Sequence, residues 1–133
     1  MAELTAQAAD RTDASPLAPV RPAIDRAHLA LMTLGERSLE REVLSLFDRQ
    51  AVMLLARMQN AEPASAAAFA HTLKGSARGI GAWRVAEAAH ALATHANRSE
   101  RREMASALRR LSMAVTEARA GIADIQRADV AAA

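Results

Sequence analysis

The stretch FAHTLKGSARGIG, residues 69–81, brings together a histidine, the only lysine of the chain and three glycines. If it is helical, each residue advances about 100°, so that Lys74 and Gly75 share the face of His71. A neutral imidazole supplies a nucleophilic lone pair, and a neighbouring ammonium can stabilise negative charge on a transferred group. Gly75 has no side chain to crowd the imidazole. These residue types at this spacing therefore favour attack by His71 on a phosphoryl group.

The same helical phase predicts that His71 points to solvent, because Phe69 and Leu73 occupy the opposite face. Lys74 is the one lysine among 17 basic residues, which indicates a site that needs a compact ammonium. The alternatives are a stray lysine for Lys74 and close helix packing for Gly75. Since Gly75 shares the side of His71 and not that of Leu73, we favour access over packing.

No metal site is expected from the other histidines. His90 and His95 are five residues apart, about 140° around a helix, and no carboxylate shares their face. His28 has no visible partner. The absence of cysteine excludes disulfides, thiolate catalysis and cysteine zinc sites. We therefore expect no metal and no cofactor in this chain.

Helices must position the histidine stretch. The hydrophobic content of 51% comes mainly from Ala, Leu, Val and Met, with only 2% aromatic residues, which favours helix over sheet. Periodicity and end signals such as Gly35, Asn60 and Pro63 predict a short helix capped by Asp25 and four longer ones. Their expected ranges are about 25–34, 36–59, 63–80, 82–96 and from 100 onward.

Short connections between these helices favour antiparallel neighbours. The predicted fold is all-α, an antiparallel up-and-down four-helix bundle with a short additional N-terminal helix. Prolines and polar residues mark 1–22 as a flexible leader, the bundle is expected over 23–128, and 129–133 is expected to be a flexible tail. The expected buried stripe of the second helix is Leu39, Val43, Leu46 or Phe47, Leu54 and Met58. That of the last helix is Met104, Leu108, Leu111, Val115, Ala118, Ile122 and Ile125.

Charge argues against some partners. Seventeen basic and 15 acidic residues leave a net charge of +2, too little for a strong field toward nucleic acid. A helix-turn-helix module over residues 66–96 is an alternative, but its reading helix, AWRVAEAAHALATHA, offers mostly alanines. No apolar run approaches the roughly 20 residues of a membrane span. We expect a cytoplasmic monomer with no nucleic-acid or membrane partner.

The stretch AHTLKGSARGIGAWRVAEAAHAL resembles the signature of histidine-containing phosphotransfer (HPt) domains of bacterial multistep phosphorelays. AIDRAHLALMTLGERSLEREVLSLFDRQA resembles the first two helices of that family, so the likeness spans residues 22–127. It implies that His71 accepts a phosphoryl group from a receiver-domain aspartyl-phosphate and passes it to another receiver. By the same match Lys74 would stabilise the phosphate and Gly75 would keep the site open. The resemblance implies a phosphocarrier without ATP-binding or autokinase activity, with Mg²⁺ on the partner receiver only.

One position departs from the family pattern. About 22 residues after the phosphorylated histidine, many members have Glu or Gln, whereas this chain has Ala93. His90 and Thr94 flank that position at helical spacing and are the candidates to compensate; the alternative is that both are ordinary half-exposed residues.

The expected docking patch for the receiver consists of small residues around His71 with a basic rim, namely Ala67, Ala68, Ala70, Arg78 and Arg84. A bundle that binds receivers without phosphotransfer is the main alternative function. A histidine-kinase dimerisation domain fits less well, because Thr72 and Leu73 follow His71 where such domains have an acidic residue and then a proline.

Overall fold

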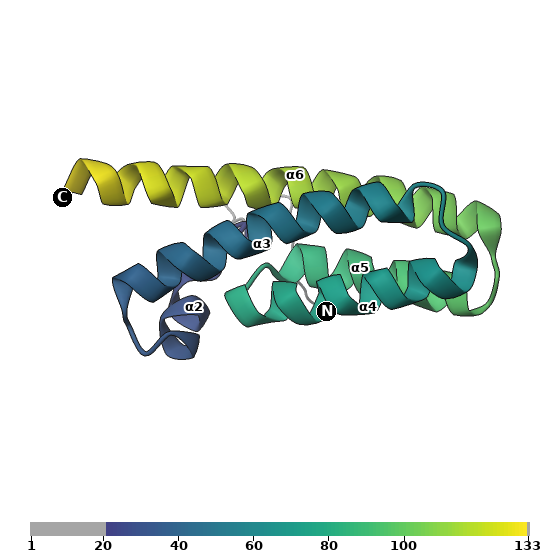
Figure 1. Ribbon diagram of the computed structural model, residues 1–133, viewed down its shortest axis with the longest axis horizontal. Helices are drawn as coiled ribbons and strands as arrows, with labels where there is room; N and C mark the ends of the chain where they lie inside the picture. The colour runs from purple at the N-terminus through teal and green to yellow at the C-terminus, as the bar shows by residue number, and fades with distance from the viewer. Residues whose placement is uncertain (1–20, 133) are drawn as a thin grey trace, which may run out of the picture.

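The computed structural model describes residues 21–132, which form five helices and no strand. The helices are α2 (Arg26–Met32), α3 (Arg37–Met58), α4 (Pro63–Ile80), α5 (Trp83–Asn97) and α6 (Arg101–Ala132). The four long helices form an antiparallel up-and-down bundle in which α3 and α5 each pack between α4 and α6, while α2 packs on α4 (Figure 1). The predicted fold class is therefore confirmed.

The C-terminal end of the chain differs from the predicted domain bounds. Of the expected leader, residues 1–20 lie outside the described residues. At the other end α6 is helical through 129–132, where we expected a tail. Arg37 reaches Asp129 across α3 and α6, with 3.1 Å between nitrogen and oxygen, which connects this last turn to the bundle.

The helix ends lie close to the predicted signals. The Asp25 carboxylate caps α2 by accepting the backbone N–H of His28 at 3.0 Å, and Pro63 occupies the first turn of α4. Gly81 ends α4 in the left-handed conformation with φ 77°. A Cβ at Gly81 would lie 2.8 Å from the Cβ of Asp25, so this turn needs glycine for both conformation and space.

Small side chains dominate the core where α4 meets its neighbours. The buried residues of α4 are Ala66, Ala67, Ala70, Leu73, Ala77 and Ile80. Those of α5 are Val85, Ala86, Ala89, Leu92 and Ala96. Alanine at these positions lets two helix backbones approach closely, so α4 and α5 form the most extensive helix pair of the bundle.

The buried stripe of α3 differs from the predicted one. Leu39 and Leu46 are exposed by 37% and 53%, whereas Glu40 is buried. Glu40 tolerates burial because the hydroxyl of Thr33 donates to its carboxylate at 3.3 Å and the guanidinium of Arg26 lies 3.9 Å away. An apolar pattern cannot anticipate a buried carboxylate, so the first part of the predicted stripe was offset by one residue, whereas Phe47, Leu54 and Met58 are buried as predicted. The observed stripe is Glu40, Leu44, Phe47, Ala51, Leu54 and Met58.

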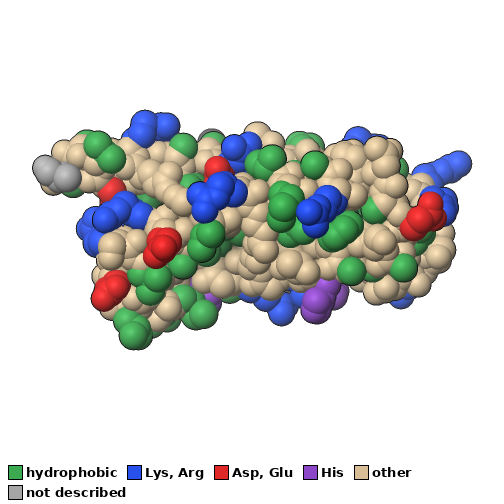
Figure 2. All heavy atoms as spheres, viewed as in Figure 1, with side chains coloured by type: hydrophobic (Ala, Val, Ile, Leu, Met, Phe, Trp, Pro, Cys, Tyr) green, Lys and Arg blue, Asp and Glu red, His purple; other side chains and the backbone are tan. Residues whose placement is uncertain are grey.

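The predicted stripe of α6 is confirmed. Leu111, Val115, Ala118 and Ile122 are buried, and the other three predicted residues pack against the core while partly exposed. Apolar side chains also reach the surface where α2 ends and α3 begins (Figure 2).

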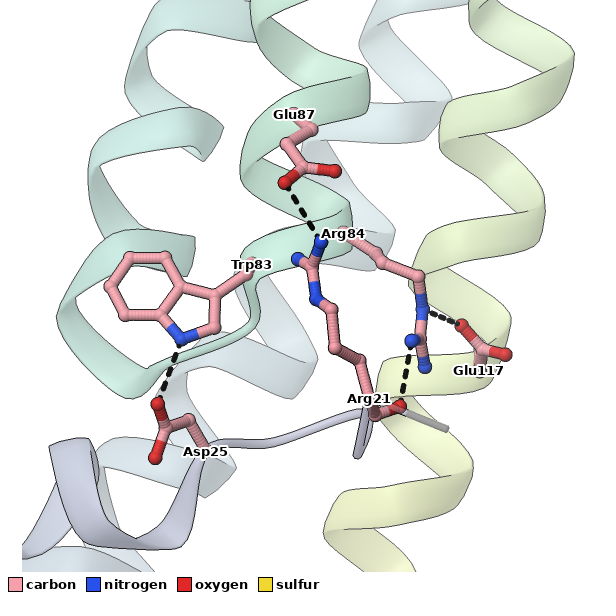
Figure 3. Close-up of polar contacts among 6 residues, drawn as sticks. All are labelled: Arg21, Asp25, Trp83, Arg84, Glu87 and Glu117. Carbon is pink, nitrogen blue, oxygen red and sulfur yellow. Dashed lines mark hydrogen bonds and ion pairs between the residues drawn. The ribbon is translucent and has the colours of Figure 1, made fainter. Parts of the chain in front are cut away.

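Residues 21–25 cross the bundle beside α5 and α6 and are held by polar contacts (Figure 3). Arg21 pairs with Glu87 at 3.1 Å, and its carbonyl accepts a hydrogen bond from Arg84 at 2.7 Å. A Cβ at Gly121 would lie 2.9 Å from the Cβ of Ala23, which explains a glycine in the middle of α6.

Asp25 joins this segment to α5. The indole N–H of Trp83 donates to its carboxylate at 3.0 Å, and this hydrogen bond, followed by that from the backbone N–H of His28, lowers the pKa of Asp25. Because the folded-state pKa lies below the unfolded value, the contribution of Asp25 to stability is present above the unfolded pKa. It is lost as the pH falls through the folded value.

We predict that Asp25→Ala lowers the melting temperature by several degrees at pH 7, since it removes both the helix cap and the acceptor of Trp83. The difference from wild type should shrink as the pH falls below about 4, the ordinary pKa of an aspartate. Thermal unfolding followed by circular dichroism between pH 7 and pH 2.5 measures this. Asp124→Ala is the control, because its exposed pair with Arg127 should contribute little. If the difference in melting temperature does not change with pH, the charge of the Asp25 carboxylate does not contribute to stability.

Candidate functional site

Helix α4 presents His71 to solvent. The imidazole is exposed, while Leu73, two residues further on, is completely buried. Gly75 and Arg78 are exposed on the same side as His71, and Lys74 is half-buried at its edge. The predicted outward orientation of His71 follows from the burial of the opposite face of α4 in the core.

Gly75 faces open space. A Cβ built on it would meet no atom within 4 Å, and the same holds for Gly79 one turn later. Close helix packing, the alternative considered for Gly75, is therefore not what this glycine provides. His71, Gly75 and Gly79 follow one another at intervals of four residues, so they form a strip of helix with little side-chain cover beside the imidazole.

Lys74 connects α4 to α5. Its ammonium nitrogen lies 3.3 Å from Nδ1 of His90. Thr94 turns instead to its own helix, where its hydroxyl donates to the carbonyl of His90 at 3.0 Å. Ala93 is half-buried and packs against the core. Of the two residues considered as compensation for Ala93, the structure brings His90 to Lys74 and leaves Thr94 in a local contact.

The other histidines have partners of a different kind. Nε2 of His28 lies 2.8 Å from the carbonyl oxygen of Arg78, and its ring lies against Trp83 with centroids 4.8 Å apart. Nδ1 of His95 lies 2.7 Å from a carboxylate oxygen of Glu100. Each thus has a ring nitrogen in a contact that supports the fold, which distinguishes both from the exposed His71.

The structure corrects part of the expected docking patch. Ala68 and Arg78 are exposed, as expected. Ala67 and Ala70 are exposed by only 9% and 0%, because α4 packs on both α3 and α5 and its buried seam is wide enough to include them. The expectation that these two alanines are exposed is wrong.

Arg84 also lies elsewhere than expected. Its Nε donates to Glu117 of α6 at 2.6 Å and Nη1 donates to the carbonyl of Arg21 (Figure 3). This places Arg84 in the groove between α5 and α6, away from the α4 face that carries His71. Its role is to hold residues 21–25 against the bundle.

A shallow groove between α4 and α5 lies beside Lys74. It is lined by Arg78, Trp83, Ala86, Glu87 and His90. Sequence reasoning did not include Trp83 or Glu87 in the site. The signal that could have found Trp83 is its identity as the only tryptophan of the chain, two residues after the glycine that ends α4.

Two further observations concern metals and membranes. Within residues 21–132, no three or more His, Asp or Glu side chains gather closely enough to hold a metal ion. None of the helices in that range has the length and apolar character needed to cross a membrane.

Comparison with known proteins agrees with this geometry. The sequence profile of the Hpt domain matches residues 42–127. Among solved structures, the chain is similar to the histidine phosphotransferase ShpA from Caulobacter crescentus, with 28% sequence identity and a TM-score of 0.62 over 81% of this chain and 94% of that one. No curated protein sequence gives a significant match. The exposed histidine on a four-helix bundle and the profile match together show that this chain belongs to the Hpt domain family, whose members perform histidine phosphotransfer in two-component signalling.

Proposed function

We propose that His71 accepts a phosphoryl group from the aspartyl-phosphate of one receiver domain and passes it to the aspartate of another. The observation that supports this most directly is an exposed imidazole beside a strip of helix that glycines leave open. Hpt domains are phosphocarriers and not kinases, so this chain would supply the histidine and the partner receivers the aspartates.

The nucleophile that this chain supplies is a lone pair of the His71 ring. The unprotonated ring nitrogen of His71 attacks phosphorus, a nitrogen–phosphorus bond forms, and the bond from phosphorus to the aspartyl oxygen breaks. The leaving group is the aspartate carboxylate, and the other ring nitrogen keeps its proton until solvent removes it. The reverse sequence delivers the group to a second receiver.

Lys74 and Gly75 have separate tasks in this step. The phosphoryl oxygens carry negative charge, which an ammonium on the same helix face stabilises. Lys74 is within one helical turn of His71, and its ammonium has three donors, so it can bind the phosphate while it donates to His90. Gly75 lets the active site of the receiver approach the imidazole without meeting a side chain.

We propose that the receiver covers His71 from the α4 side, with Ala68, Arg78 and the groove containing Trp83 and Glu87 around the reacting atoms. Ala68 and Arg78 are exposed on the His71 helix, and the groove adds apolar surface and charge of both signs. A contact of this kind needs only modest area, near or below about 1,200 Å², which suits exchange between partners.

We predict that His71→Gln abolishes phosphoryl transfer from a phosphorylated receiver and leaves the melting temperature nearly unchanged, because the exposed ring has no part in the core. Incorporation of acid-labile phosphate, with mass-spectrometric mapping of the labelled peptide, measures this. His95→Gln is the matched control and should keep full labelling. Label on the His71→Gln protein, or on His28, His90 or His95, would overturn the assignment.

We predict that Gly75→Gln and Gly79→Gln both leave the bundle as stable as wild type or stabilise it by several tenths of a kcal/mol, since both positions are open and helical. Only Gly75→Gln, one turn from His71, should slow transfer by about tenfold or more, the scale that follows from about 1.4 kcal/mol or more of added barrier. Melting temperatures and single-turnover transfer rates test both statements. Equal transfer by the two variants would show that access at Gly75 is not limiting.

We predict that Lys74→Ala slows transfer by roughly five- to a hundredfold, the equivalent of about 1–3 kcal/mol for a hydrogen bond to a charged group. Lys74→Arg should restore only part of the rate, because a planar guanidinium cannot occupy the same point beside the imidazole. Single-turnover transfer from one phosphorylated receiver, compared at two salt concentrations, measures both. Identical rates for wild type, Ala and Arg would remove Lys74 from the mechanism.

A further inference from the structure

The contact between Lys74 and His90 constrains the protonation state of His90. An ammonium has three donors and no acceptor, so Nδ1 of His90 must be unprotonated to accept from Lys74 at 3.3 Å. The neutral ring then carries its proton on Nε2.

The contact also limits where the Lys74 ammonium lies. A lysine side chain has four rotatable bonds, and ordering it costs up to about 2 kcal/mol of rotamer entropy. The hydrogen bond from Lys74 to α5 orders the Lys74 side chain at the edge of the His71 face before a phosphate binds. Less of its rotamer entropy is then lost during the transfer.

The other charged side chains of the groove have different positions or partners. Arg78 of α4 lines the same groove as His90, and Glu87, one turn earlier on α5, is already paired with Arg21.

We propose that His90 is a positioning residue for phosphotransfer: by accepting a hydrogen bond from Lys74, its ring holds the ammonium beside His71. Since Lys74 acts on phosphate only if His71 carries it, this role rests on the proposed phosphotransfer. His90 thus supplies a polar side chain from α5 near the site. It lies one turn before Ala93, the position at which many family members have Glu or Gln.

The first test compares single-turnover transfer at pH 8 by wild type, His90→Ala, His90→Gln and the control His95→Gln. His90→Ala should be about three- to tenfold slower, the scale expected for an exposed hydrogen bond to a charged group. His90→Gln should stay within about twofold of wild type, because its amide oxygen can accept from Lys74. His95→Gln should match wild type. Equal rates for Ala and wild type, or no rescue by Gln, would overturn the proposal.

The second test separates an action through Lys74 from direct contact with the receiver. In a Lys74→Ala background, His90→Ala should have no further effect on transfer, since the group that it positions is gone. An additional loss equal to that of the single variant would show that His90 acts independently of Lys74, and the proposal would be wrong.

A measurement without phosphate keeps the proposal distinct from the proposed function. Nitrogen-15 NMR of the histidine rings at pH 8 should show His90 unprotonated at Nδ1, with a resonance that moves in Lys74→Ala and not in Arg84→Ala. Failure of wild type to accept any label from a set of phosphorylated receivers would contradict the phosphotransfer. If the Nδ1 resonance of His90 is the same in wild type and Lys74→Ala, the positioning contact is contradicted, whatever the labelling result.

Discussion

The rotation of α4 about its own axis is set by one seam of buried side chains, and the position of every site residue depends on it. Ala70, Leu73 and Ala77 are completely buried where α4 packs against its neighbours. With about 100° per residue, burial of these three leaves His71 and Gly75 no other direction than toward solvent. The helix thus carries the core on one side and the chemistry on the other, and turning it by one residue would destroy both.

Small residues serve two different purposes on this helix. Alanines on the inner side allow α5 to come close, which brings His90 within hydrogen-bonding distance of Lys74. Glycine on the outer side leaves space that a receiver can enter. The same reduction in side-chain size therefore supports packing at Ala70 and access at Gly75, and only the direction in which each residue points distinguishes the two.

The basic residues divide in a similar way. Arg84, Arg119 and Arg37 each bind a carboxylate on another helix, and these pairs connect the outer surfaces of the bundle. Exposed pairs contribute little individually, but a planar guanidinium suits such fixed contacts. Lysine appears only at Lys74, where its partner is the ring of His90. An ammonium has three donors and can bind a phosphate while it donates to that ring, whereas the charge of a guanidinium paired with a carboxylate is already balanced.

The sequence by itself determined the helices and the relation of His71 to Lys74 and Gly75, because positions within one helix follow from its period alone. Local signals such as Asp25 and Pro63 placed the helix ends for the same reason. The tertiary structure decided what covers each helix flank: it buried Ala67 and Ala70, and directed Arg84 to Glu117. It also paired Glu40 with Thr33 and brought His90 to Lys74. Those outcomes depend on the distance and angle between helices, which arise from the packing of many side chains and not from the spacing of a few.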